Sequence, residues 1–228
     1  MPLNDGRESP THFFLQHGWG FDQRSFREWP EILGPGAVTL LDRGYLGGAP
    51  VQLSNDHSGE QRILVSHSLG LHFVTIDQLA SFAMIVVLSG FASFHGLNPG
   101  GSSISRKHIA RMKRRLRREP EKLLADFYRD CSWPGQLPDF ARMNVDLLAD
   151  DLHLLDTAVL RELGASQACR VLILHGALDR IVSVERAAEL QALVAGSTLQ
   201  VIDDAGHGLP FTHARQCLAH ITEHVKRL

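Results

Sequence analysis

The chain has 228 residues, 44% of them hydrophobic, and a formal net charge of −2. This length and composition suffice for the buried core of one domain, and the charge excludes a uniformly basic nucleic-acid-binding protein. A helix that spans a membrane is also excluded, because no apolar stretch approaches the roughly 20 residues that cross a bilayer.

Six short apolar runs recur along the chain, and turn-forming residues directly follow most of them. Each run holds four or five residues rich in Val, Ile and Leu without alternation, which is typical of strands buried on both faces of a parallel sheet. The runs span residues 12–16, 37–41, 62–65, 84–88, 170–174 and 198–202, and helical patterns between them span 24–33, 69–80, 183–194 and 211–226. Strands that alternate with helices predict an α/β protein with a doubly wound, mostly parallel sheet.

One long segment, residues 94–165, breaks the alternation. It holds several helical patterns, interrupted by Pro120, Pro134 and Pro138, but no convincing buried strand. We therefore expect a helical cap over residues 94–165, inserted after the fourth strand, and a core formed by residues 1–93 and 166–228.

Three polar turns that follow strands carry residues suited to nucleophilic catalysis. They are SHSLG with Ser68, HGALD with Asp179 and DDAGHG with His207. A serine hydroxyl becomes a good nucleophile when an imidazole takes its proton, and a buried carboxylate fixes the tautomer of that imidazole. Since the carboxyl ends of parallel strands meet at one edge of the sheet, we expect the three side chains to form a catalytic triad.

These motifs resemble those of α/β-hydrolase fold esterases over nearly the whole chain, without the usual first strands. The matching segments are QHGWG, SHSLG, LHGALDRIV and AGHG, in the chain order Ser, Asp, His that the fold uses. Together with the helical cap, they are most similar to the pimeloyl-acyl-carrier-protein methyl ester esterases of biotin synthesis.

The resemblance implies further site features. It implies an oxyanion hole formed by the backbone N–H groups of Trp19 and Leu69, and catalysis without a cofactor or metal. The sequence departs from the family pattern G-x-S-x-G at Ser66, which replaces the first glycine. Gly70, two residues after Ser68, keeps the frame and assigns Ser68 rather than Ser66 as the nucleophile.

Other residues compete for these roles. His17 and His175 precede glycines at strand ends, where an imidazole commonly braces a loop, and His67 fits a buried structural position. Asp203 and Asp204 are alternative acids near His207, but the Asp179 turn fits the family pattern better. A metal site built from His67, His72 and His95 has no regular ligand spacing.

The helical cap contains a strongly basic segment. Residues 106–118, RKHIARMKRRLRR, hold eight Lys and Arg and no acidic residue, with Ile109, Met112 and Leu116 on one helical face. Such charges on a solvated face repel one another, and an anionic partner would relieve that cost. We expect an acidic acyl carrier protein, rather than nucleic acid, to bind the opposite face, formed by Arg111, Arg114, Arg115 and Arg118.

Together these features predict a serine carboxylesterase that hydrolyses an acyl methyl ester. Two alternatives remain at this stage: a thioesterase or lyase on the same fold, and a ligand-binding protein that keeps the pocket without turnover. The first residues, MPLNDGRESPTH, lack the apolar core of a signal peptide. The three cysteines form no C-x-x-C pair or disulfide framework, and we expect a cytoplasmic protein.

Overall fold

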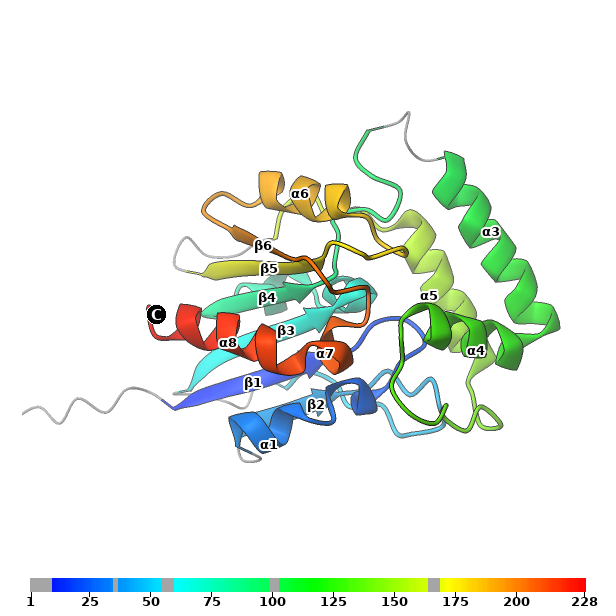
Figure 1. Cartoon of the computed structure of the whole chain (residues 1–228), viewed down its shortest axis with the longest axis horizontal. Coiled ribbons are helices and arrows are strands. Elements are labelled where there is room, and N and C mark those ends of the chain that lie inside the picture. Colours follow the sequence, from blue (N-terminus) through cyan, green and yellow to red (C-terminus); the bar gives the residue numbers. More distant parts are fainter. Residues whose placement is uncertain (1–9, 35–36, 55–59, 99–102, 164–168) are drawn as a thin grey trace, which may run out of the picture.

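The computed structural model describes residues 10–34, 37–54, 60–98, 103–163 and 169–228. Within them, six strands form one sheet in the order β2-β1-β3-β4-β5-β6, and all five neighbouring pairs are parallel (Figure 1). The strands are β1 (Thr11–Gln16), β2 (Val38–Leu41), β3 (Gln61–His67), β4 (Met84–Leu88), β5 (Arg170–Gly176) and β6 (Thr198–Ile202). All six predicted strands and the parallel sheet are confirmed.

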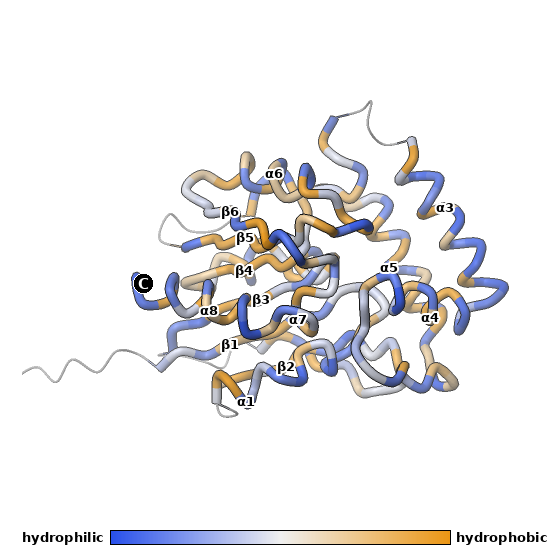
Figure 2. Tube along the Cα trace, in the orientation of Figure 1, coloured by the Kyte–Doolittle hydropathy of each residue, from blue (hydrophilic) through white to orange (hydrophobic). Residues whose placement is uncertain are grey.

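Helices cover both faces of the sheet. On one face the strands pack against the 3-10 helix η1 (Gln23–Phe26), α1 (Trp29–Leu33) and α8 (Ala214–Val225). On the other face they pack against the 3-10 helix η3 (Ser68–Phe73), α2 (Ile76–Leu79) and α6 (Val184–Leu193). Successive strand residues point to opposite faces, so Ile63 and Val65 enter the first core and Leu64 enters the second. This explains why the central strand β4, which is buried along its whole length, is apolar throughout (Figure 2).

Three helices lie between β4 and β5 among the described residues and form the cap. They are α3 (Ser103–Arg118), α4 (Pro120–Asp130) and α5 (Val145–Thr157), and Figure 1 shows them beyond the ends of the strand arrows. Their buried side chains form a third apolar cluster with Leu69 and other core residues. The expected boundary between residues 165 and 166 lies outside the described residues.

The helical patterns in the core are shorter in the structure than the sequence predicts. The expected helix over 69–80 divides into η3 and α2, because Val74 is extended and Thr75 begins α2 with a capping box to Gln78. The pattern over 24–33 divides into η1 and α1, and the pattern over 211–226 divides into α7 (Leu209–Thr212) and α8. Only the pattern over 183–194 forms one helix, α6.

No helix among the described residues is long and apolar enough to cross a membrane. Residues 1–9, where the sequence predicts no signal peptide, lie outside the described part of the chain.

Candidate active site

Ser68 lies on the sharp turn that joins β3 to η3. Its φ angle is +54°, in the left-handed region that a residue other than glycine seldom adopts. Such strain persists where the surrounding structure enforces it, commonly at functional sites. The turn directs Ser68 out of the end of the strand, although the residue is only 8% exposed. This is the backbone geometry expected of a nucleophile on a strand-to-helix turn.

Gly70 makes this turn possible. A Cβ atom on Gly70 would lie 2.8 Å from the carbonyl oxygen of Gln16 and 2.9 Å from that of His17. Both atoms belong to backbone, which cannot move aside as a flexible side chain could. The close approach of η3 to the end of β1 therefore requires glycine at position 70.

The structure brings Ser68, His207 and Asp179 together from three separate loops. The Nε2 atom of His207 lies 3.1 Å from the Oγ atom of Ser68, and its Nδ1 atom lies 2.8 Å from Oδ2 of Asp179. Because a carboxylate only accepts hydrogen bonds, Nδ1 carries the proton and donates it. Nε2 is then free to accept the hydrogen bond of the serine hydroxyl.

Asp179 is held as a buried carboxylate. Its side chain is 0% exposed, and its Oδ1 accepts hydrogen bonds of 2.8 Å from the backbone N–H groups of Ile181 and Val182. Burial would raise the pKa of Asp179, but the charge and hydrogen bond of His207 and the N–H of Val182 outweigh it and hold the pKa below its usual value. Asp179 therefore stays ionised beside the imidazole.

The alternative acid Asp204 lies apart from this arrangement. Its side chain is 81% exposed, and its Oδ1 lies 3.6 Å from Nε2 of His213. Asp203 is also exposed. The carboxylate that contacts His207 is that of Asp179.

His67 holds the backbone of the loop that carries His207. Its Nε2–H donates a hydrogen bond of 2.9 Å to the carbonyl oxygen of His207, and the two rings lie 5.0 Å apart. Burial lowers the pKa of His67 to about 3, so the ring is neutral near pH 7. The sequence predicts a buried structural His67, which the structure confirms, but no sequence pattern reveals its partner 140 residues away.

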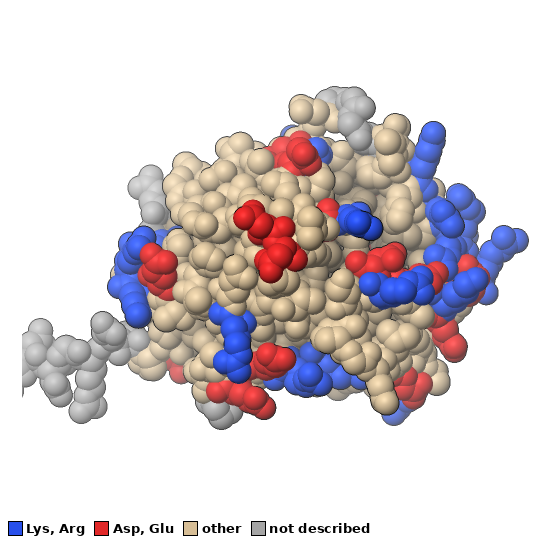
Figure 3. Space-filling view, viewed as in Figure 1, with Lys and Arg blue, Asp and Glu red and all other residues tan. Residues whose placement is uncertain are grey.

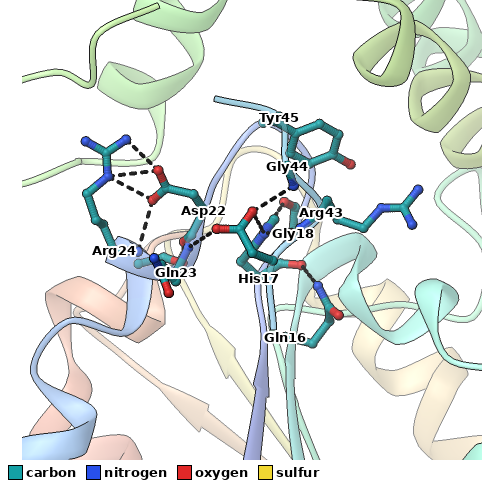
Figure 4. Close-up of polar contacts among 12 residues, drawn as sticks. Gln16, His17, Gly18, Asp22, Gln23, Arg24, Arg43, Gly44 and Tyr45 are labelled. Atoms are coloured by element: carbon teal, nitrogen blue, oxygen red, sulfur yellow. Dashed lines mark hydrogen bonds and ion pairs between the residues drawn. The ribbon is translucent and has the colours of Figure 1, made fainter. Parts of the chain in front are cut away.

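The turn after β1 lies against the nucleophile. A Cβ atom on Gly18 would lie 3.0 Å from Cβ of Ser68, so the Gly18–Trp19 peptide runs beside it. His17 braces this turn, as expected: its Nδ1–H donates to the Gly18 carbonyl at 2.9 Å, and its Nε2 accepts from the N–H of Arg43 at 3.1 Å. Figure 4 shows His17 and Gly18 beside the loop that carries Arg43 and Tyr45.

Three other histidines that the sequence analysis considered have structural partners. His175 lies 2.9 Å from the carbonyl of Val182, and His72 lies 3.1 Å from that of Phe91. His95 bridges Ser105 and Asp156 at 2.8 and 2.9 Å. The described ranges contain no group of three or more His, Cys, Asp or Glu side chains that could hold a metal ion.

The basic face of α3 is smaller than the sequence predicts. Arg115 is tied to Glu119 at 2.8 Å and to Asp126 on α4 at 2.5 Å, so its charge is balanced within the cap. Three others, Arg111, Arg114 and Arg118, are exposed and have no ion pair among the residues that the structure describes. Figure 3 shows Lys and Arg side chains gathered along α3.

No protein-family model and no curated protein sequence matches the chain. Solved structures match it over nearly its full length. An esterase from Exiguobacterium antarcticum aligns with a TM-score of 0.75 at 16% identity, covering 96% of this chain and 92% of that one. A bromoperoxidase from Bacillus anthracis aligns with a TM-score of 0.73 at 17% identity, covering 95% of this chain and 92% of that one.

An enol-lactonase from Burkholderia xenovorans aligns with a TM-score of 0.71 at 16% identity, covering 97% of this chain and 94% of that one. The chain has the α/β-hydrolase fold. The α/β-hydrolase neighbours carry different reactions in their names, so the fold alone assigns none of them to this chain. The reaction depends on the side chains at the strand ends.

Proposed function

We propose that this α/β-hydrolase is a serine esterase that hydrolyses acyl esters through a covalent acyl-enzyme. The observation that carries the proposal is the unbroken chain of hydrogen bonds from Ser68 through His207 to Asp179. This arrangement activates a hydroxyl for attack on a carbonyl carbon.

In the proposed reaction, Ser68 Oγ attacks the ester carbonyl while its proton passes to Nε2 of His207. Asp179 stabilises the imidazolium that forms. His207 then returns the proton to the leaving alkoxide, which departs as an alcohol and leaves the acyl group on Ser68. A water molecule attacks this acyl-enzyme, again with His207 as the base, and the carboxylic acid is released.

We assign the oxyanion hole to the backbone N–H groups of Leu69 and Trp19. Leu69 directly follows the nucleophile, and the turn that carries Trp19 lies against Ser68. Two fixed donors aimed at the developing oxyanion stabilise the transition state more than the ground state. Removal of one such donor typically costs about 10²- to 10³-fold in kcat.

The cap supports a more specific substrate. Apolar side chains from all three cap helices share one buried cluster with Leu69 and Trp19, among them Met112, Leu124 and Leu148. An aliphatic acyl chain is the substrate group that such apolar surroundings of the nucleophile favour. Since Arg111, Arg114 and Arg118 leave positive charge on the cap surface, we propose an acyl ester on an acidic acyl carrier protein, pimeloyl-acyl-carrier-protein methyl ester above all.

Covalent labelling tests the reaction class. A fluorophosphonate probe, followed by mass spectrometry of the digested protein, should modify Ser68, and Ser68→Ala should lose both labelling and hydrolysis of a p-nitrophenyl ester. Ser89 is the matched control, because it has a φ of +50° at the end of β4 but is fully buried. Labelling at Ser89, or hydrolysis that persists in Ser68→Ala, would contradict the proposal.

The substrate is tested separately. Expression of the protein in an esterase-deficient biotin auxotroph should restore growth, and Ser68→Ala should not. Purified enzyme should also release methanol from the methyl ester faster than it cleaves a carrier thioester of the same chain. Faster cleavage of the thioester would make the protein a thioesterase.

A further inference from the structure

The turn at residues 18–21 touches the cap at its tip. The N–H of Phe21 donates to the Gly18 carbonyl at 3.4 Å, which closes a tight turn around Trp19. Gly20 has a φ of +73°, a conformation that glycine adopts without strain. The buried His17 side chain fixes the start of this turn. Trp19 and Gly20, at the tip of the turn, are held by other elements.

Two cap helices make hydrogen bonds to that tip. The hydroxyl of Tyr128, on α4, donates to the Gly20 carbonyl at 3.0 Å, and the indole N–H of Trp19 donates to the carbonyl of Leu148, on α5, at 2.9 Å. The contact is close, since a Cβ atom on Gly20 would lie 3.1 Å from Cδ2 of Leu124. The cap therefore packs directly on the turn.

Both hydrogen bonds are shielded from water. Tyr128 is 0% exposed and Trp19 is 3% exposed, and burial raises the pKa of Tyr128, so its hydroxyl remains a donor. A buried polar group that loses its partner costs free energy. The turn is thus held where it lies as long as α4 and α5 remain in place.

We propose that Tyr128 and the indole of Trp19 are positioning groups through which the cap places the Trp19 backbone N–H in the oxyanion hole. The inference rests on the proposed ester hydrolysis. A substrate or carrier protein that shifts α4 and α5 would change the oxyanion hole through these two contacts. Binding at the cap would then alter kcat as well as substrate affinity.

The hydroxyl of Tyr128 can be removed without loss of its ring. Tyr128→Phe should lower kcat for a small p-nitrophenyl ester by about tenfold, less than the loss of a whole donor, with KM nearly unchanged. Affinity for a trifluoromethyl ketone should fall by a similar factor, because its adduct with Ser68 places an oxyanion in the same hole. A role in stability alone would leave both quantities unchanged in the folded enzyme.

Tyr45→Phe is the matched control. Tyr45 is also 0% exposed, and its hydroxyl also bridges core and cap, donating to Asp151 on α5 at 2.5 Å, but it makes no hydrogen bond to residues 18–21. This variant should lose at least as much thermal stability as Tyr128→Phe while it keeps kcat and affinity for the ketone.

Full kcat and ketone affinity in Tyr128→Phe, or equal losses in both tyrosine variants, would overturn the inference. If Tyr128→Phe does not fold, Trp19→Phe decides by the same criteria, because it removes the indole N–H and keeps an aromatic ring. Failure of the proposed function is recognised separately, since the wild-type enzyme would then not hydrolyse the ester or would not depend on Ser68.

Discussion

Ser66 donates a hydrogen bond of 3.3 Å from its hydroxyl to the backbone carbonyl of Val86 on the neighbouring strand. The side chain is fully buried in β3. Its Cβ and hydroxyl therefore fit where the family pattern has glycine, and the hydroxyl is paired. Ser66 occupies a structural position, two residues from the serine that contacts His207.

The first prediction separates the two serines. Ser68→Ala should abolish ester hydrolysis, because it removes the only atom of the pair within hydrogen-bond distance of His207. Ser66→Gly should keep most of kcat and lose stability by about 1 kcal/mol, the usual net value of one hydrogen bond. Steady-state kinetics and urea denaturation of both variants measure this. Labelling of Ser66 by a fluorophosphonate would contradict it.

The second prediction concerns the acid. Asp179→Asn should reduce kcat by a factor on the order of 10⁴, with a smaller change in KM, because the amide favours the wrong tautomer of His207 and cannot stabilise the imidazolium. Asp204→Asn, three residues before His207 in the chain but with a side chain that is 81% exposed, should retain near-wild-type kcat. The opposite ranking of the two variants would assign the acid to Asp204.

The third prediction concerns pH and His67. Burial is the main cause that lowers its pKa to about 3; electrostatic repulsion from His207 and His17 adds to it, and the hydrogen bond to the His207 carbonyl and the charge of Asp179 oppose it. Between about pH 6.5 and 3 the unfolded chain binds a proton at His67 that the folded chain does not. Folded stability should therefore fall with decreasing pH, by up to about 1.4 kcal/mol per pH unit from this group.

His67→Gln isolates this contribution. Glutamine keeps an N–H donor for the carbonyl of His207 but does not titrate. The free energy of unfolding of the wild type, measured relative to that of His67→Gln in urea, should decrease from pH 7 to pH 5. A difference that stays constant over this range would mean that His67 binds its proton as readily in the folded protein as in the unfolded chain.

The sheet could be predicted from the sequence because each of its strands is marked by a pattern of neighbouring residues. Each strand is a short apolar run, and each run ends in residues that form turns, so the six strands and their parallel arrangement follow from pattern alone. The helix expected over 69–80 was wrong in its continuity. Its apolar spacing is helical, but Val74 is extended and Thr75 starts a new helix, a local break that periodicity does not detect.

Site residues could be predicted where they follow strands, but not where their contacts depend on the packing of the cap and the loops. Ser68, Asp179 and His207 could be selected because each follows a strand, the topology joins strand ends, and each fits a motif of the α/β-hydrolase fold. The contacts of His67 with His207 and of Tyr128 with Gly20 join residues more than 100 positions apart. They depend on how the cap and loops pack, for which the sequence holds no signal.

The ion pairs of the basic helix α3 also could not be predicted from the sequence. They define the fourth prediction. Periodicity places Arg115 on the solvated face of α3, but in the structure Glu119 and Asp126 balance its charge. Arg111, Arg114 and Arg118 are the arginines of the predicted set that remain for an anionic partner. Reversal of these three to Glu should raise KM for a carrier-linked ester by at least tenfold and leave kcat/KM for a small uncharged ester nearly unchanged.

A control of equal charge keeps this test specific. Reversal of Arg27, Arg215 and Lys226, which are exposed on the core, changes the net charge by the same amount without touching the cap. It should affect the carrier-linked reaction much less, because charges beyond a Debye length of about 8 Å at physiological ionic strength are largely screened. Added salt should raise KM for the carrier-linked ester in the wild type and in the core variant, but little in the cap variant, whose steering charges are gone. Equal losses of kcat/KM on both substrates in the cap variant would mean that α3 shapes the acyl-binding site. No loss on either substrate would mean that these arginines only form a solvent-exposed face.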